Sequence, residues 1–206
     1  LDYPKPTIGL AALAVVFLLS AITWLRADQM STPLIGTQIE ATRHATSARA
    51  NYNAAWALIK AGYGDIGDPM GGNSIRYYFE HAETVDPSFK LGYHGLLVWV
   101  CASGRPVESQ WLDMFAQKLE KTVYGHGQKQ MPAYLLKPLI AMPACLSRED
   151  ALRLFMAGAG NPRLEPKVRS QFLESASDYE LAVWGDLVSV KAYLERAAEL
   201  SPLDGR

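Results

Sequence analysis

Residues 51–62 read NYNAAWALIKAG, and after a glycine-rich interval residues 74–87 read SIRYYFEHAETVDP. In both stretches apolar residues recur three or four positions apart, the spacing that aligns them on one face of an α-helix. Pro87 disfavours helix at the residue before it, so the second helix is expected to end near Asp86. The two stretches therefore predict a pair of helices packed against each other.

The same periodicity continues along the chain from Ala41, whereas the alternation typical of strands is nearly absent. Clusters of glycine and proline separate the periodic segments and predict turns. Helices are expected at Ser47–Ala61, Asn73–Val85, Leu91–Ala102, Val107–Val123, Ala133–Cys145, Ser147–Ala157, Pro166–Ser175 and Tyr179–Leu200. Pro138 and Pro143 should kink or break the fifth of these, and the last should be a bent helix or a helical pair.

The N-terminal part of the chain has a different pattern. Residues Ile8 to Leu25, IGLAALAVVFLLSAITWL, carry no charge and no proline. Such a helix is about 27 Å long, close to the hydrocarbon core of a bilayer at roughly 30 Å. A buried core helix and a signal peptide are the alternatives, but the run is longer than a signal core and no small-residue cleavage site follows it. We predict one membrane span.

The predicted fold class is all-α, with an N-terminal transmembrane helix followed by an array of helical hairpins. Residues 1–30 form the transmembrane anchor and its exit, and residues 31–206 form one helical-repeat domain. Lys5 and Arg26 flank the span on opposite sides, so the charges do not decide its orientation. The chain begins at Leu1 and not at Met, which suggests a processed product or a fragment of a longer protein.

A short motif occurs twice, because residues 179–202, YELAVWGDLVSVKAYLERAAELSP, share a spacing with residues 74–87. A large apolar residue is followed after three positions by Ala and after five more by Pro. The positions are Phe79, Ala82 and Pro87 in one copy, and Leu194, Ala197 and Pro202 in the other. The small Ala lets two helices approach, the large residue fills the groove between them, and Pro ends the second helix.

These segments resemble the tetratricopeptide repeat, and the resemblance covers about half of the chain. It implies stacked helical hairpins that expose a concave binding surface. Residues 63–72 would be an insertion in the first unit, and residues 133–175 do not match the motif.

A second resemblance concerns the membrane junction, where WLRADQ at residues 24–29 precedes SARANYNAAWAL at residues 47–58. This arrangement is similar to the tail of multi-spanning bacterial glycosyltransferases and of O-antigen ligase or polymerase relatives. In those proteins a last span leads into a periplasmic helical-repeat domain. None of that family's catalytic residues can be placed in this chain.

Composition and charge exclude some classes of function. The 206 residues are 49% hydrophobic and 20% charged, with a formal net charge of −1 and no run of Lys and Arg. Nucleic-acid binding needs a concentrated basic face, so no nucleic-acid partner is expected. Cys101 and Cys145 could pair in an oxidising compartment, but we favour two buried thiols.

The sequence contains no recognisable catalytic, cofactor or metal motif. The four histidines are scattered, and no glycine-rich phosphate loop or nucleophile elbow is present. Tyr93 and His94 could face a groove, although core packing near Trp99 is the interpretation we favour. The candidate site is a concave groove for a peptide or glycan segment, lined by Tyr52, Asn53, Arg76 and Tyr77.

The leading hypothesis is a membrane-anchored scaffold that binds a protein partner and catalyses no reaction itself. The alternative is a C-terminal accessory domain of a polytopic membrane glycosyltransferase or O-antigen ligase relative, with a glycan as a possible ligand. The resemblance implies the bacterial inner membrane as the location, with the soluble domain in the periplasm.

Overall fold

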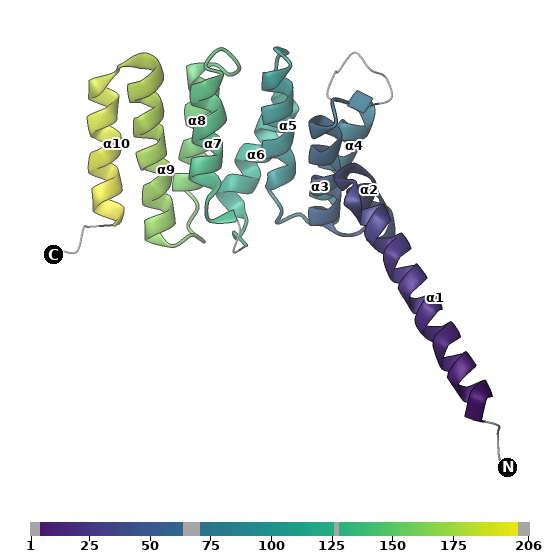
Figure 1. Cartoon of the computed structure of the whole chain (residues 1–206). Helices are drawn as coiled ribbons and strands as arrows, with labels where there is room; N and C mark the ends of the chain where they lie inside the picture. Colours follow the sequence, from purple (N-terminus) through teal and green to yellow (C-terminus); the bar gives the residue numbers. More distant parts are fainter. Residues whose placement is uncertain (1–4, 64–70, 126–127, 202–206) are drawn as a thin grey trace.

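The structure is a computed structural model that describes residues 5–63, 71–125 and 128–201. Throughout these residues the secondary structure is helical, with no strand (Figure 1). The α-helices are α1 (Lys5–Ser31), α2 (Pro33–Arg43), α3 (Ala48–Lys60), α4 (Gly71–Val85), α5 (Leu91–Ala102), α6 (Ser109–Lys121), α7 (Met131–Ala141), α8 (Arg148–Ala159), α9 (Pro166–Tyr179) and α10 (Leu187–Leu200).

Helix α1 stands apart from the rest of the molecule and projects away from it (Figure 1). Within α1, the 20 residues Gly9–Asp28 are long and apolar enough to cross a membrane, and none of them is buried against the rest of the protein. An amphipathic surface helix would carry a polar stripe, whereas apolar side chains surround α1 on all sides. The predicted apolar N-terminal helix is confirmed.

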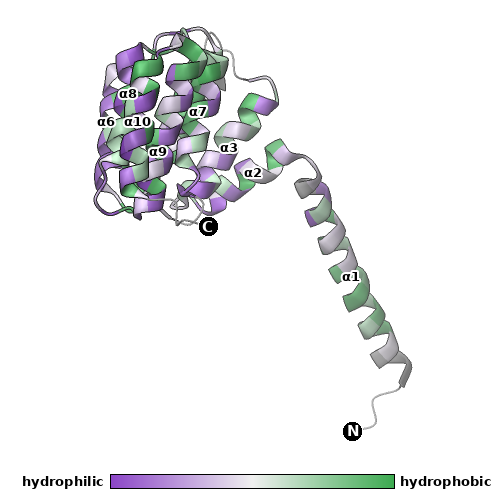
Figure 2. Ribbon diagram, turned by 90° about the vertical axis from the view of Figure 1, so that its left-hand side faces the viewer, coloured by the Kyte–Doolittle hydropathy of each residue, from purple (hydrophilic) through white to green (hydrophobic). Residues whose placement is uncertain are grey.

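Helices α3 to α10 form an array of antiparallel hairpins, as predicted, in two layers (Figure 1). The first helix of each pair contacts the first helix of the next, giving one layer of α3, α5, α7 and α9. The second helices form the other layer, and α6, α8 and α10 lie together on one side when the array is viewed end-on (Figure 2). Helix α2 lies on the opposite side, next to α3, and α1 extends from α2 away from the array.

Three clusters of buried side chains form the core, and the two larger ones meet at α5 and α6. One cluster joins α3 and α4 to α5 through residues such as Phe79 and Leu96, and the other extends from α5 to α10. Tyr93 and Val107 pack against both clusters. The core is therefore continuous from α3 to α10.

Local signals place several helix ends where the sequence predicts them. The Ser47 hydroxyl accepts a hydrogen bond from Ala50 N at 3.3 Å, and the Ser147 hydroxyl accepts one from Asp150 N at 3.0 Å. Both serines are N-caps, the position that side-chain oxygens favour because they satisfy free N–H groups in the first turn. Helix α5 begins and ends at the predicted residues, Leu91 and Ala102.

Other elements differ from the prediction. No helix was predicted between the apolar N-terminal helix and Ser47, but residues 33–43 form α2, with Pro33 in the first turn where its missing N–H costs nothing. Helix α7 continues through Pro138 but ends at Ala141, so the segment Ala133–Cys145 is broken before Pro143, as predicted. Helix α9 continues past Ser175 to Tyr179 and into a π-helical turn, Glu180–Trp184, before Gly185 turns the chain at φ 66°.

The repeated motif is only partly reproduced in the packing. Phe79, Ala82 and Ala197 are buried, whereas Leu194 is 47% exposed and fills no groove. Helix α10 is the outermost helix of the described array, so no further helix covers the face that carries Leu194. Pro202 lies outside the described residues, as does most of the proposed insertion, residues 64–70.

The cysteine prediction is wrong. Cys101 at the end of α5 and Cys145 after α7 form a disulfide, with their Cα atoms 5.2 Å apart. The two residues are 44 positions apart, so only the packing of α5 beside α7 brings them together.

Candidate binding groove

A groove of about 470 Å³ crosses three successive hairpins. Its walls come from α3, α5 and α7, the first helices of their pairs, and from the loops before α5 and before α7. The lining residues are Arg49, Tyr52, Asn53, Phe89, Leu91, His94, Gly125, Gln128 and Tyr134. A groove of this kind runs across the array, so an extended ligand could contact several helices at once.

Two of the four predicted groove residues, Tyr52 and Asn53, line this groove. Tyr52 is held by aromatic contacts on three sides, with ring centroids 6.2 Å from Trp56, 5.8 Å from Phe79 and 5.8 Å from Phe89. Burial raises the pKa of the Tyr52 hydroxyl, which therefore stays protonated at neutral pH. Asn53, the next residue of α3 after Tyr52, is exposed.

The other two, Arg76 and Tyr77, lie elsewhere on α4 and do not line the groove. The Arg76 guanidinium donates to Glu80 at 3.0 Å and to Glu108 at 2.8 Å, and it lies 4.8 Å from the centre of the Trp111 ring. Tyr77 is 57% exposed. These two side chains lie on the outer side of α4, where Arg76 joins α4 to α6 and Tyr77 faces solvent.

The groove contains one residue that the sequence interpretation assigned to the core. His94 is 8% exposed, and its Nε2 lies 2.9 Å from the carbonyl oxygen of Tyr134. A carbonyl only accepts, so Nε2 carries the proton and Nδ1 is left as an acceptor. Nδ1 is buried and has no hydrogen-bond partner among the described residues. Burial lowers the pKa of His94, so the ring is neutral.

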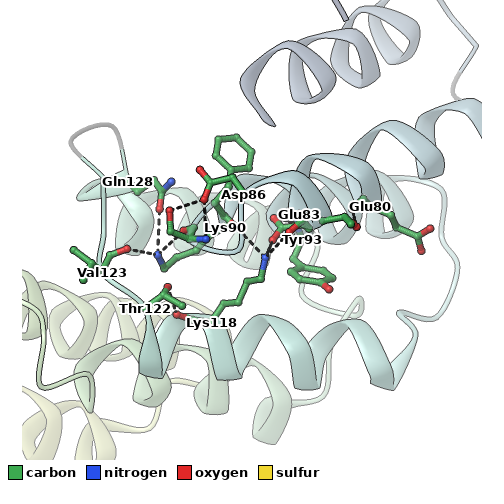
Figure 3. Close-up of polar contacts among 12 residues, drawn as sticks. Glu80, Glu83, Asp86, Lys90, Tyr93, Lys118, Thr122, Val123 and Gln128 are labelled. Atoms are coloured by element: carbon green, nitrogen blue, oxygen red, sulfur yellow. Dashed lines mark hydrogen bonds and ion pairs between the residues drawn. The ribbon is translucent and has the colours of Figure 1, made fainter. Parts of the chain in front are cut away.

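A buried polar network forms the support behind the groove (Figure 3). The Lys90 ammonium donates to the carbonyl oxygens of Ser88 at 3.0 Å and Val123 at 2.9 Å, and to the groove residue Gln128 at 3.2 Å. It also lies 4.0 Å from the centre of the Tyr124 ring. Lys90 thereby links the loop before α5 to the loop before α7, which are the two loops that line the groove.

The charge and chemistry of the groove suit a polar ligand with apolar parts. Arg49 is exposed and has no ion pair among the described residues, so it supplies one uncompensated positive charge. Asn53 offers a donor and an acceptor, Gln128 offers the N–H groups of its amide because its oxygen accepts from Lys90, and Tyr52, Phe89 and Tyr134 supply aromatic surface. No group of three metal-ligating side chains occurs within the described ranges.

A second groove adjoins the first at Asn53, which lines both. It has a volume of about 500 Å³ and lies between α2 and α3. Its lining is mostly apolar and consists of Thr32, Pro33, Leu34, Thr37, Asn53, Trp56, Ala57, Lys60 and Ala61.

Comparison of the chain with known protein families, with curated proteins and with solved structures finds no match. The geometry alone therefore defines the class of this protein. It is an all-helical, two-layered array with an apolar N-terminal helix and a groove across its first hairpins.

Proposed function

We propose that this protein is a membrane-anchored scaffold whose groove binds an extended segment of a partner protein. The observation that carries the proposal is the groove itself, which runs over α3, α5 and α7 and places Tyr52, Asn53 and Gln128 along one path. A peptide backbone repeats donors and acceptors along its length, and amide side chains spaced along a groove can pair with them. Aromatic rings between the amides would contact its side chains.

The array supports a tetratricopeptide-like interpretation of the fold, because paired helices stack in two layers and leave the first-helix layer to line a groove. The span in α1 would hold the array next to a bilayer. The same groove would serve an accessory domain of a polytopic glycosyltransferase. Aromatic rings also stack on sugars, so a glycan ligand is a possible outcome of the binding experiment below.

The disulfide supports the proposed location of the array in the periplasm of a bacterium, outside the inner membrane. Disulfides persist in oxidising compartments and are rare where glutathione and thioredoxin keep thiols reduced. The pair Cys101 and Cys145 links two separate hairpins of the array. We therefore place the helical domain on the oxidising side of the membrane.

The groove can be tested by photocrosslinking in living cells. A photoreactive phenylalanine analogue would replace Asn53 or Gln128 in the groove, and Gln117 on α6 as the matched control outside it. A protein adduct is expected at both groove positions and not at Gln117, and Arg49→Glu should weaken it. Adducts of equal yield at all three positions would rule out the groove as the site. A carbohydrate adduct would favour the glycan ligand instead.

The compartment can be tested on the same chain without any partner. Cells would be quenched in acid and their proteins treated with a thiol-reactive polymer before and after reduction. Because Cys101 and Cys145 are the two cysteines of the sequence, no shift is expected before reduction and a two-thiol shift afterwards. Full modification without reductant would place the domain in a reducing compartment.

A further inference from the structure

Exposed apolar side chains gather at the end of the array farthest from α1 (Figure 1). Among the described residues outside α1, no other stretch of this length exposes as many large hydrophobic side chains as residues 181–194. They are Leu181, Trp184, Leu187, Val188 and Leu194, with exposed fractions from 47% to 82%. The terminal units of helical arrays need a polar outer face to stay soluble, and a large exposed apolar patch is typical of an interaction surface. This end of the array is therefore a candidate for contact with another molecule.

The outer face of α10 has the periodicity of a helix that pairs with another helix. Four exposed residues follow one another at intervals of four, three and four positions: Leu187, Lys191, Leu194 and Ala198. This spacing lines them up along the helix, as the a and d positions do in a coiled coil. The other side of α10 is already used, because it contacts α9 and Tyr193 packs against the core. These four residues, the α10 seam, thus leave room for one further helix.

The charges at the α10 seam favour a second copy of the same helix. Lys191 lies in the seam and Glu195 lies next to it, and their side chains are 78% and 64% exposed. Within one chain they are 3.7 Å apart, and such an exposed pair contributes little stability. When two α10 helices face each other, Lys191 of each copy can reach Glu195 of the other, so the interface gains two ion pairs. A two-fold interface requires a surface that is complementary to itself in this way.

The direction of α1 decides how two copies can be arranged. Helix α10 runs along the helices of the array, and α1 extends below the array in both views (Figures 1 and 2). A two-fold axis parallel to α10 keeps both α1 helices on the same side. Antiparallel pairing of the α10 helices would send the α1 helices in opposite directions. Of these two symmetric arrangements, only the parallel one suits two chains whose α1 helices span the same bilayer.

We propose that two copies of this protein form a parallel dimer through the α10 seam. Leu187 and Leu194 of each copy pack against their counterparts, and the second layer of helices continues from one array into the other. Lys191 in the middle of the seam fixes the register, as single polar residues at such positions do. The dimer carries two partner grooves, one near each outer end. Its parallel orientation rests on the proposed span in α1, whereas the α10 seam itself does not.

Cysteine crosslinking tests the dimer on the full chain in the membranes of the expressing cells. Cys101 and Cys145 are paired with each other, so a cysteine introduced on α10 supplies the free thiol. In a parallel dimer the two copies of residue 198 lie within disulfide distance, and Ala198→Cys should give a covalent dimer on a non-reducing gel after mild oxidation. Ala192→Cys, about 120° away around the same helix, is the matched control and should stay monomeric.

Three results of this experiment would overturn the proposal. The first is an Ala198→Cys chain that stays monomeric or crosslinks no more than Ala192→Cys. The second is a link from Ala198→Cys to a different protein, which would make that protein the occupant of the seam. The third is a dimer that forms only when Val188→Cys and Ala198→Cys chains are coexpressed, since this pair of positions meets in an antiparallel arrangement.

Charge exchange separates pairing between copies from the ion pair within one chain. In the Ala198→Cys background, Lys191→Glu and Glu195→Lys each place like charges across the seam, so each should lower the yield of dimer at least about fivefold. Coexpression of the two variants brings opposite charges together again, and the crosslinked heterodimer should regain the parental yield. An ion pair that acts only within one chain would not be restored by mixing, so a heterodimer yield as low as that of each variant alone would overturn the proposal.

An apolar variant completes the test. Leu194→Glu places a charge in the middle of the α10 seam and should lower the Ala198→Cys dimer at least about tenfold, because a buried apolar contact at an interface is lost. Leu194 is exposed within one chain, so circular dichroism should show unchanged helicity. Undiminished crosslinking of Leu194→Glu would show that the seam is not the interface.

Discussion

At the scale of single residues, one carboxylate joins three helices. Glu83 on α4 accepts a hydrogen bond from Tyr93 N, in the first turn of α5, at 3.0 Å, and forms an ion pair with Lys118 on α6 (Figure 3). Lys118 also donates to the carbonyl oxygen of Phe89 at 3.2 Å. The Glu83 side chain is 3% exposed, and burial raises its pKa to about 7, against the opposing effect of Lys118.

This raised pKa makes stability depend on pH in a predictable direction. Between about pH 4.5 and pH 7 the folded protein holds a proton on Glu83 that the unfolded chain has released. The free energy of unfolding contributed by Glu83 should therefore fall as pH rises through this window. Urea unfolding of the wild type and of Glu83→Gln at pH 5 and pH 8 measures it. The free energy of unfolding of the wild type, relative to that of Glu83→Gln, should be lower at pH 8 than at pH 5. A higher value at pH 8 would contradict the raised pKa of Glu83.

Lys90 offers a second test at the residue scale, because it is 0% exposed and yet carries an ammonium group. Removing that group in Lys90→Met leaves three acceptors without their donor, on Ser88, Val123 and Gln128. Hydrogen bonds to charged groups contribute about 1.5–3 kcal/mol each, so a loss of at least about 2 kcal/mol is expected. Chemical denaturation measures the loss. Lys137→Met, an exposed lysine on α7, should change stability by less than about 0.5 kcal/mol.

At the scale of elements, α5 is the helix on which the packing depends. Its sequence, LGYHGLLVWVCA, is apolar on nearly all sides, and it contacts α3, α4, α6 and α7. Gly92 and Gly95 let it approach α4 closely. A Cβ at Gly95 would lie 2.3 Å from Cε1 of Phe79, and one at Gly92 would lie 2.6 Å from the carbonyl oxygen of the same residue. Neither glycine has a positive φ, so neither is needed for the conformation of the backbone. Their role is to leave room for the contact between α4 and α5.

Gly95→Ala should therefore destabilise the array although alanine favours helix. Overpacking a well-packed core costs about 1–3 kcal/mol, which exceeds the gain of about 1 kcal/mol in helix propensity. The measurement is the free energy of unfolding in urea. Gly125→Ala is the matched control, because its nearest contact would be 3.8 Å away, and it should show no loss. Equal stability of Gly95→Ala and the wild type would mean that α4 and α5 can separate without cost.

At the scale of the whole molecule, the protein consists of the apolar helix α1 and the packed helices α2 to α10. Helix α1 projects from the array and contacts it through α2 (Figure 1). None of its residues Gly9–Asp28 is buried against the rest of the protein. The core clusters contain no residue of α1. The stability of the array should thus come from α2 to α10.

Deletion of residues 1–31 tests this separation. The truncated chain should be soluble without detergent and should unfold within about 5 °C of the full chain, because no buried core contact is lost. Thermal circular dichroism of both proteins in the same mild detergent makes the comparison. A fall of more than about 10 °C would show that α1 stabilises the array, and persistent aggregation would show that it covers an apolar surface.

The sequence by itself determined the helical class, the apolar N-terminal helix and most helix positions, because these follow from local chemistry. Serine hydroxyls cap α3 and α8, Pro166 begins α9, and the unbroken apolar run of α5 can only be buried. Helix α2 was not predicted, because packing against α3 overrides the weak helix propensity of its sequence.

Only the tertiary structure decided which of these elements meet. Periodicity shows the apolar face of a helix but not the neighbour that covers it. Of the four residues predicted to line one groove, Tyr52 and Asn53 lie together in it, whereas Arg76 and Tyr77 lie elsewhere on α4. His94, the disulfide partners and the two adjoining grooves depend on residues about 30 to 90 positions apart in the chain. Such contacts depend on the three-dimensional packing of whole helices, and no local pattern encodes them.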